Sequence, residues 1–243
     1  MQAARTHRAA PSLDGQAPRV AELKRRAAAC QWPNFIVVEG PIGVGKTTLA
    51  RNLAAVLSYP LLLEPALENP FLDRFYREPG RHALPTQLFF LLNRARQLAD
   101  LSDDALVEPV LVADYLMDKD RLFAGVTLDE NELRLYEEIH DNLDLRPPRP
   151  DLVIFLQAPV DMLLDRIRRR GIEFEQQIDS RYIESIAEAY ARFFHFYDRS
   201  PLLVVNAAVI DFAGNPDHLE ALLDCIRDME GGRQYFNPTP SLL

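Results

Sequence analysis

The amino-acid sequence predicts an α/β fold, a parallel five-stranded sheet with helices on both faces. Three observations support this prediction. Residues 35–50, FIVVEGPIGVGKTTLA, run from an apolar strand through a glycine-rich loop into a helix. Further apolar runs of strand length alternate with helix-patterned segments, which is typical of parallel strands joined by crossover helices. The 243 residues, 48% of them hydrophobic, are enough for one continuous core. In such a sheet the ligand site lies at the carboxyl ends of the strands.

Each element is expected from its local pattern. Residues 1–33 hold few large apolar side chains, which predicts a disordered N-terminal extension. The folded domain is expected over residues 34–230, followed by a C-terminal tail over 231–243. The predicted strands, all apolar runs, are 35–38, 61–64, 110–114, 151–156 and 202–205. The predicted helices are 49–57, 69–76, 85–101, 128–143, 159–170, 178–197 and 216–229, with Pro79 and Gly80 separating the second from the third.

Charge and cysteine content argue against several classes of protein. The 27 basic and 36 acidic residues give a net charge of −9, which argues against binding to a nucleic acid polymer or an anionic membrane. Cys30 and Cys225 predict neither a disulfide framework nor a thiolate metal site, and point to a reducing compartment. No apolar run reaches the roughly 18 residues of a membrane helix, and the N-terminus lacks the apolar core of a signal peptide. A soluble cytoplasmic protein is therefore expected.

The glycine-rich loop fits the phosphate-binding pattern Gly-x-x-x-x-Gly-Lys-Thr. Backbone N–H groups of such a loop, and the helix that follows it, surround phosphate oxygens. Lys46 is expected to reach the β and γ phosphates, and Thr47 to bind Mg²⁺. The residues predicted to bind a nucleoside triphosphate are Gly40, Gly43, Gly45, Lys46, Thr47 and Thr48.

Two carboxylates stand at the ends of predicted strands. Glu64 ends the second strand, where it could accept a proton from an attacking hydroxyl or hold a metal-bound water. Asp114 ends the run PVLVAD, where an acid can hold Mg²⁺ or its waters. The alternatives are a solvated acid at position 64 and a structural cap at position 114.

A group of arginines ends the helix predicted over 159–170. Arg166, Arg169 and Arg170 share one face by their spacing, and Arg168 points off it. Such a cluster suits a polyanion and, with Lys46, could neutralise a transferring phosphoryl group. A solvated basic helix end is the alternative. The histidines and cysteines show no metal-ligand spacing or nucleophilic triad, so phosphoryl transfer is the chemistry predicted.

With these residues in view, the chain resembles the deoxyribonucleoside kinase family, in its bacterial deoxyadenosine and deoxyguanosine kinase branch. The resemblance covers about residues 34–227. It is carried by Glu64-Pro65 followed by ENPF, and by FYREPGR, TQLFFLLNRARQL, DKDRLFA and RIRRRGIEFEQQI. It implies a P-loop kinase fold with an Arg-rich lid, ATP as phosphate donor with Mg²⁺, and phosphorylation of a deoxynucleoside 5′-hydroxyl in nucleotide salvage. It also implies a homodimer.

The resemblance assigns roles to residues of this sequence. On the donor side it places Arg166 and Arg170 on the phosphates, and Asp211 and Phe212 in the loop that holds adenine. On the acceptor side it implies Glu64 as base for the 5′-hydroxyl, Tyr76 and Glu175 at the 3′-hydroxyl, and Gln87, Arg94 and Asp120 at the nucleobase.

Two departures from the family pattern stand out. Tyr115 follows Asp114 where the family usually has an arginine, and Ile172 follows Arg170-Gly171 where it usually has another. Both put the transfer of individual roles in doubt, though not the fold.

The acceptor is expected to be a deoxynucleoside, purine more than cytidine, with thymidine poor. The Gln87 amide can pair with two adjacent polar atoms of a base edge. Arg94 and Asp120 could serve a second polar site, where thymine would leave the Asp120 carboxylate unpaired. Alternatively, Arg94 and Asp120 form a structural ion pair. The family resemblance favours purines over cytidine.

Two other functions compete. Residues 77–80, REPG, imitate a motif of thymidylate kinase, but in that enzyme the motif directly follows the second strand. A nucleotide-binding switch protein is suggested by residues 211–214, DFAG, yet the guanine-reading Asn-Lys-x-Asp motif is absent from the sequence.

Overall fold

The protein is described here from a computed structural model, which defines residues 17–102 and 109–237. The described chain forms a six-stranded, wholly parallel sheet in the order β2-β3-β1-β4-β5-β6. The central strands are buried on both faces, so they read in sequence as unbroken apolar runs. The strands are β1 (Phe35–Glu39), β2 (Leu61–Leu62), β3 (Leu111–Ala113), β4 (Leu152–Gln157), β5 (Leu202–Asn206) and β6 (Arg233–Phe236).

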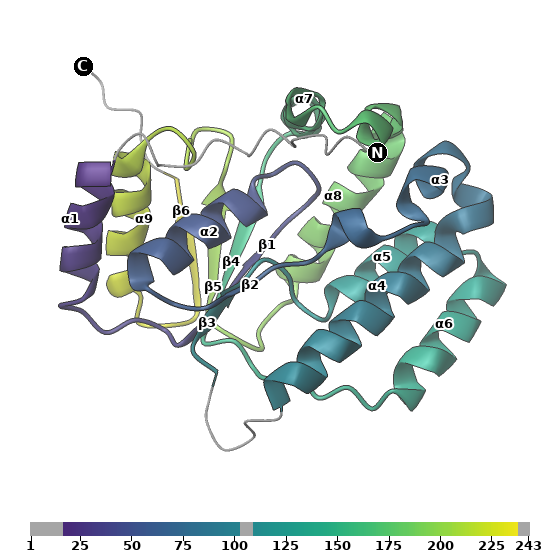
Figure 1. Cartoon of the computed structure of the whole chain (residues 1–243), viewed down its shortest axis with the longest axis horizontal. Helices are drawn as coiled ribbons and strands as arrows, with labels where there is room; N and C mark the ends of the chain where they lie inside the picture. The colour runs from purple at the N-terminus through teal and green to yellow at the C-terminus, as the bar shows by residue number, and fades with distance from the viewer. Residues whose placement is uncertain (1–16, 103–108, 238–243) are drawn as a thin grey trace, which may run out of the picture.

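Helices cover both faces of this sheet (Figure 1). The nine α-helices of the described residues are α1 (Ala17–Ala27), α2 (Lys46–Leu57), α3 (Leu72–Arg77), α4 (Pro79–Ser102), α5 (Lys119–Thr127), α6 (Glu130–Asn142), α7 (Val160–Arg170), α8 (Ser180–His195) and α9 (Pro216–Arg227). Short 3₁₀ turns occupy Ala66–Glu68 and Glu173–Gln177.

The core has two layers because side chains of a strand alternate between its faces. Ile36 and Val38 of β1 point to the face covered by α1, α2, α7 and α9. Phe35 and Val37 point to the other face, covered mainly by α5 and α8. The remaining helices, α3, α4 and α6, extend the molecule beyond that layer (Figure 1). The α/β prediction is confirmed. The carboxyl edge of the parallel sheet is free for a site.

The sheet has one strand more than expected. The tail predicted over 231–243 contributes β6, in which Arg233–Phe236 pairs in parallel with β5. The tetrapeptide RQYF is short and mixes two polar with two aromatic residues, so its sequence alone does not predict a strand. It becomes a strand because it pairs with the otherwise open edge of β5 through backbone hydrogen bonds.

The N-terminal extension is not wholly disordered. Residues 1–16 lie outside the described part, but α1 packs beside α9 at one end of the molecule (Figure 1). Leu23 and Ala27 enter the core, and Arg19 pairs with Asp217 of α9 at 3.0 Å. The prediction of disorder over 17–33 was therefore wrong for α1. Basic residues dominate this helix, and the acidic residues that pair with them lie on α9, far along the chain.

Several helix boundaries differ from the prediction. Pro79 begins α4 rather than separating it from α3, because a helix's first residue needs no N–H donor. Pro85 lies inside α4, where the Thr86 hydroxyl donates to the His82 carbonyl at 2.7 Å. Helix α5 was not predicted as a separate element, and α6 begins only after a capping box formed by Asp129 and Glu132. None of the helices in the described ranges is long and apolar enough to span a membrane.

Candidate active site

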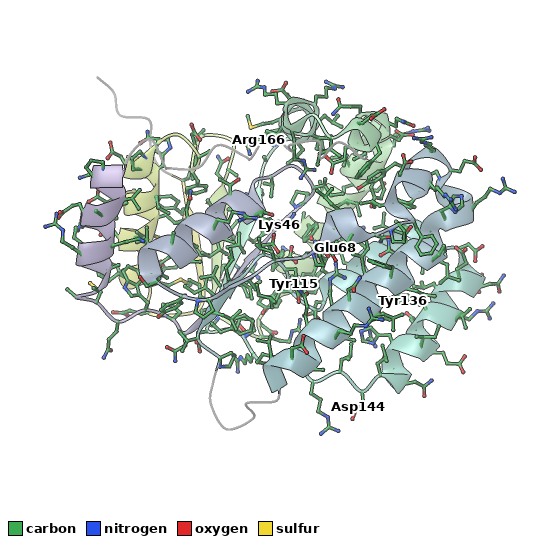
Figure 2. All side chains as sticks on the ribbon, viewed as in Figure 1. Lys46, Glu68, Tyr115, Tyr136, Asp144 and Arg166 are labelled. Carbon is green, nitrogen blue, oxygen red and sulfur yellow. The ribbon has the colours of Figure 1, made fainter. Side chains whose placement is uncertain are left out.

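The phosphate-binding loop lies between β1 and α2, at the carboxyl edge of the sheet. The first residue before α2, Gly45, has φ of +108° and gives the helix no side-chain cap. Backbone N–H groups at that helix end therefore point toward the site, as anion binding requires. Lys46 lies near the middle of the molecule (Figure 2), and its Nζ donates to the carbonyls of Gly40 at 2.7 Å and Pro41 at 3.0 Å. Burial, helped by repulsion from Lys119, lowers the pKa of Lys46 to about 8.

The glycines of the loop are needed for close packing as well as for phosphate. A Cβ on Gly40 would lie 2.3 Å from the Leu156 carbonyl oxygen, and one on Gly43 would lie 2.8 Å from Ile167 Cγ1. The underside of the loop therefore rests on β4 and on α7. At Gly45 a Cβ would meet nothing within 4 Å. Packing therefore requires glycine at positions 40 and 43, and the positive φ of +108° favours it at position 45.

Asp114 connects the loop helix to the second strand. Its Oδ2 accepts a hydrogen bond from the Thr47 hydroxyl at 2.6 Å, and its Oδ1 accepts one from the Glu64 backbone N–H at 2.8 Å. A carboxylate and a hydroxyl this close, beside phosphate-binding N–H groups, suit Mg²⁺, which commonly takes one or two protein ligands plus phosphate oxygens. No group of three or more His, Cys, Asp or Glu residues that could hold a metal occurs in the described ranges. Thr48 lies half-buried on the same first turn of α2.

Glu64 is held between two cations. Its Oε1 pairs with Arg94 of α4, and its Oε2 accepts from Lys119 Nζ of α5 at 2.5 Å. Burial alone would raise the pKa of this carboxyl, but Arg94 and Lys119 outweigh burial and lower it to about 2. Glu64 is therefore ionised throughout the neutral range, and the alternative of a solvated strand-end acid is wrong.

Gln87 and Arg94 form the deep wall of the pocket, and Asp120 lies behind Arg94. Arg94 pairs with Glu64 on one side and Asp120 on the other, and all three deep residues are at most 3% exposed. Arg94 Nε and Asp120 Oδ2 are buried without a hydrogen-bond partner among the described residues. Burial raises the pKa of Asp120 to about 6 despite the nearby Arg94. The ion pair thus exists, and it still carries unused hydrogen-bonding capacity.

Tyr76 and Glu175 lie together at the outer wall. The Tyr76 ring stacks on Phe174 with centroids 6.1 Å apart. Burial, reinforced by Glu175, raises the pKa of the Tyr76 hydroxyl above its usual range. Glu175 is 6% exposed and accepts from Arg170 Nε at 2.9 Å and Nη2 at 2.6 Å. The two residues expected at the sugar 3′-hydroxyl are thus brought together, beside a lid arginine.

The lid arginines separate in the structure. Arg166 donates to the carbonyls of Val44 at 3.0 Å and Ala207 at 2.7 Å, so it bridges the phosphate-binding loop and the chain after β5. Burial lowers the pKa of Arg166, against the opposing effect of Asp211. Arg169 turns away and pairs with Asp165 at 2.5 Å in solvent. The predicted common face of three arginines is therefore wrong for Arg169. Arg170 lines the same cavity as Glu64, and Arg166 lies against the phosphate-binding loop.

The loop expected to hold adenine lies after β5. Asp211 is exposed, and its Oδ1 accepts from the N–H groups of Ala213 and Gly214, each at 2.9 Å. Phe212 is 6% exposed and packs in the core, and its carbonyl accepts from Asn52 Nδ2 at 2.6 Å. The Phe212 ring is therefore a core residue, and contact with adenine would come from the backbone of this loop.

Sequence reasoning missed Lys119 and Glu39. Glu39 ends β1 directly before the glycine loop, and its buried carboxylate accepts from Gly40 N and the Tyr190 hydroxyl, both at 2.8 Å, and from Leu116 N at 2.9 Å. It fixes the start of the phosphate-binding loop to the chain after β3. The available signal was an acid closing an otherwise apolar strand. For Lys119 the only sequence signal was its place directly before Asp120 in the segment DKDRLFA.

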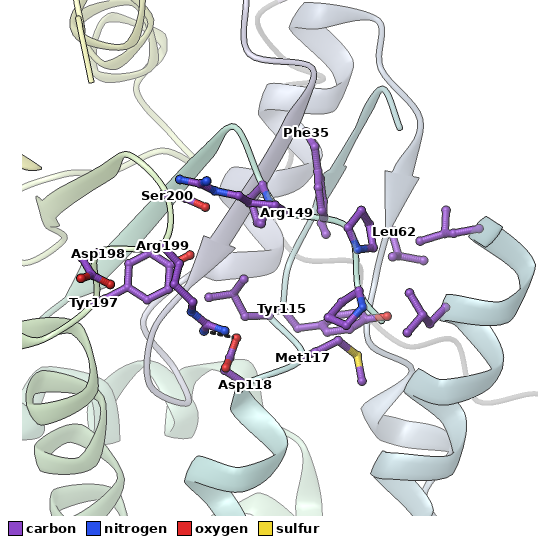
Figure 3. A pocket seen from close by; sticks show the side chains of 17 residues that line it. Phe35, Leu62, Tyr115, Met117, Asp118, Arg149, Tyr197, Asp198, Arg199 and Ser200 are labelled. Carbon is purple, nitrogen blue, oxygen red and sulfur yellow. Dashed lines mark ion pairs between the residues drawn. The ribbon is translucent and has the colours of Figure 1, made fainter. Parts of the chain in front are cut away.

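Two cavities lie on different parts of the molecule. The smaller one measures about 130 Å³, and its lining includes Lys46, Thr47, Glu64, Gln87, Arg94 and Glu175. A larger cavity of about 410 Å³ lies toward the amino ends of β1, β4 and β5, with Phe35, Arg149 and Ser200 on its wall (Figure 3). An ion pair between Arg199 and Asp118, 2.5 Å apart, crosses it (Figure 3). The larger cavity holds no residue of the phosphate-binding loop, so the smaller one is the candidate active site.

Comparison with known proteins agrees with this geometry. The chain matches the family model described as deoxynucleoside kinase over residues 36–229. It is 39% identical over 158 residues to a deoxyguanosine kinase of Bacillus subtilis, covering 64% of this chain and 76% of that protein. It is 31% identical over 207 residues to a deoxyguanosine kinase of Lactobacillus acidophilus, covering 79% of this chain and 89% of that one. A solved deoxyadenosine kinase from M. mycoides superposes with a TM-score of 0.70 at 24% identity, over 80% of this chain and 100% of the other. The chain belongs to the deoxynucleoside kinase family.

Proposed function

We propose that this kinase transfers the γ-phosphoryl group of ATP to the 5′-hydroxyl of a deoxyribonucleoside, with purine deoxynucleosides preferred. The observation that carries the proposal is the continuous chain of polar contacts from Thr47 through Asp114 and Glu64 to Arg94 and Asp120. It links the phosphate-binding loop to a buried polar pocket of a size and chemistry suited to a nucleobase. Two of the relatives named above are deoxyguanosine kinases, which supports a purine acceptor.

The chemistry follows from this series of polar contacts. Glu64 accepts the proton of the 5′-hydroxyl as the hydroxyl oxygen bonds to the γ phosphorus. The bond from that phosphorus to the β–γ bridging oxygen breaks, ADP leaves, and Glu64 later releases the proton to solvent. Lys46, Arg166 and Arg170 place positive charge where the transferred group carries negative charge. Thr47 and Asp114 would hold Mg²⁺, which would supply further charge neutralisation when bound.

The acceptor side follows from the deep wall. The Gln87 amide would pair with adjacent polar atoms of the base, and the free capacity of Arg94 and Asp120 would serve a second position. Tyr76 and Glu175 would take the 3′-hydroxyl. A purine presents more polar edge atoms to such a wall than thymine, whose methyl group offers none.

The monophosphate kinase alternative loses support from the structure. A thymidylate kinase must hold its acceptor's phosphate with cations, and Arg77 of the REPG segment instead pairs with Asp73 at 2.9 Å on the exposed side of α3. Glu64 would repel an acceptor phosphate at the strand end.

Two further properties are proposed with the function. The resemblance to the family implies a homodimer, and Leu92 of α4 and Leu135 of α6 are exposed apolar side chains that a second copy could cover. Light scattering on the purified protein measures its mass in solution. The free thiols of Cys30 and Cys225 are consistent with a reducing cytoplasm.

One experiment tests the proposed function. ATP consumption is measured with deoxyadenosine, deoxyguanosine, deoxycytidine, thymidine and dTMP as acceptors. We expect the highest kcat/KM for a purine deoxynucleoside. Thymidine as the best acceptor would overturn the role given to Gln87, Arg94 and Asp120, and dTMP as the best acceptor would overturn the acceptor class.

A further inference from the structure

Lys119 is a buried cation that the function proposed above leaves without a role. It is the first residue of α5, it is 7% exposed, and it lines the same cavity as Glu64 and Lys46. Its Nζ donates to Glu64 Oε2 at 2.5 Å and lies 5.5 Å from the centroid of the Phe123 ring. A lysine this buried costs free energy unless its charge is compensated.

Neutralising Glu64 does not by itself explain Lys119. The other oxygen of the same carboxylate already pairs with Arg94, so Glu64 has two cations for one negative charge. Asp120 takes part of the Arg94 charge. On its other side Lys119 faces Lys46, and the two ammonium groups repel each other. Two lysines directed into one cavity favour a ligand with negative charge between them.

We propose that Lys119 is a positioning residue of the phosphoryl transfer, which fixes the Glu64 carboxylate toward the acceptor hydroxyl and supplies a second lysine charge opposite Lys46. The proposal rests on the function proposed above and deepens it. When Glu64 takes the hydroxyl proton, its negative charge is lost. The Lys119 charge then loses its partner at the moment when the entering phosphoryl oxygens carry negative charge nearby.

The segment between β3 and α5, residues 114–118, holds no cation that could take this position. Tyr115, which follows Asp114, donates its hydroxyl to Gln97 Oε1 at 2.7 Å, and its ring lies 5.5 Å from the Arg94 guanidinium carbon. Among the described residues that follow β3, Arg121 faces solvent and pairs with Asp141 at 2.5 Å. Lys119, at the start of α5, therefore supplies the positive charge that the end of β3 lacks.

The test compares three variants with the wild-type enzyme, using ATP and the best deoxynucleoside. Lys119→Met removes the charge, Lys119→Arg keeps it, and Arg121→Met removes a cation of the same helix that faces solvent. We expect kcat to fall roughly 100-fold in Lys119→Met with both KM values changed less than about threefold. We expect Lys119→Arg to recover most of the loss and Arg121→Met to match the wild type.

The split between kcat and KM separates positioning from packing, because a loss of packing around the site would change substrate binding as well as turnover. Recovery of kcat in Lys119→Arg would tie the loss to the positive charge at this position.

The outcomes are distinguishable. A wild-type kcat in Lys119→Met, or a loss that Lys119→Arg does not recover, would overturn the proposal, as would an effect confined to the KM values. If thermal unfolding shows that Lys119→Met does not fold, Lys119→Gln takes its place under the same criteria. If the wild type phosphorylates no deoxynucleoside, the proposed function itself fails, independently of Lys119.

Discussion

At the scale of single residues, Glu64 occupies the point where the donor and acceptor halves of the site meet. Its carboxylate accepts from Arg94 and Lys119, and its backbone N–H donates to Asp114. With a pKa of about 2 it is a weak base. In the proposed reaction it would therefore orient the hydroxyl and take its proton late, which suits a transfer whose transition state has little bonding to the nucleophile.

Glu64→Gln should lower kcat by roughly 10²- to 10⁴-fold, because it removes the proton acceptor and keeps the shape. Deoxynucleoside affinity, measured by calorimetry, should change little. The matched control is Glu68→Gln, an exposed glutamate four positions on (Figure 2). A near-normal kcat in Glu64→Gln would show that another group accepts the proton.

Asp114→Asn should raise the Mg²⁺ concentration needed for half-maximal rate, because an amide oxygen is a poorer ligand for this hard cation than a carboxylate. Saturating Mg²⁺ should restore part of the rate. Asp118→Asn is the control, since Asp118 pairs with Arg199 at the other cavity. If the Mg²⁺ titration of Asp114→Asn overlays the wild type, Asp114 acts only as the structural link between Thr47 and Glu64.

Sequence motifs were enough to predict those site residues that lie within a recognisable segment. Glu64, Gln87, Arg94 and Asp120 each stand in a recognisable segment. The structure brings the first three into one pocket and places Asp120 against Arg94. Lys119 and Glu39 were not identified, because what defines them is a partner far along the chain. Lys119 lies 55 positions from Glu64, and Glu39 lies 77 positions from the Leu116 N–H that it accepts.

At the scale of elements, the strands of the central sheet were predictable because burial on both faces leaves a continuous apolar run. Helix α1 and strand β6 were not, because each is stabilised by a neighbour rather than by its own pattern. Arg19 and Arg26 of α1 pair with Glu220 of α9, and β6 adds to the edge of β5. The boundary of α4 was misplaced because proline breaks a helix only where its N–H is needed.

The contact between the phosphate-binding loop and α7 gives a prediction at this scale. Gly43→Ala should raise the KM for ATP more than that for the deoxynucleoside, because its Cβ, at φ of +83°, would lie 2.7 Å from the Leu163 carbonyl oxygen. Overpacking of this kind costs about 1–3 kcal/mol. The control is Gly125→Ala in α5, where a Cβ meets nothing within 4 Å. Equal KM values for ATP in the two variants would mean that the loop shifts without consequence.

At the scale of the whole molecule, the site occupies one edge of the sheet while α1 and α9 stabilise the far end (Figure 1). Folding stability and substrate binding should therefore be separable by mutation. Leu23→Ala should lower the free energy of unfolding by about 2–5 kcal/mol, because a buried leucine leaves a cavity. Both KM values should stay unchanged.

Chemical denaturation and steady-state kinetics measure the two quantities for Leu23→Ala. Lys24→Ala, at the adjacent exposed position, should change stability by no more than about 0.5 kcal/mol. A raised KM in Leu23→Ala would show that the end of the molecule bearing α1 communicates with the site.

The cations of the donor side are already hydrogen-bonded within the protein. Lys46 donates to Gly40 and Pro41, Arg166 to Val44 and Ala207, and Arg170 to Glu175. An anion that draws on these cations must displace such partners, and a single inorganic phosphate reaches too few of the groups to compensate for all of the broken bonds. A triphosphate spans the loop and the lid together. We therefore expect free phosphate to be a poor inhibitor, so that turnover continues even where free phosphate far exceeds ATP.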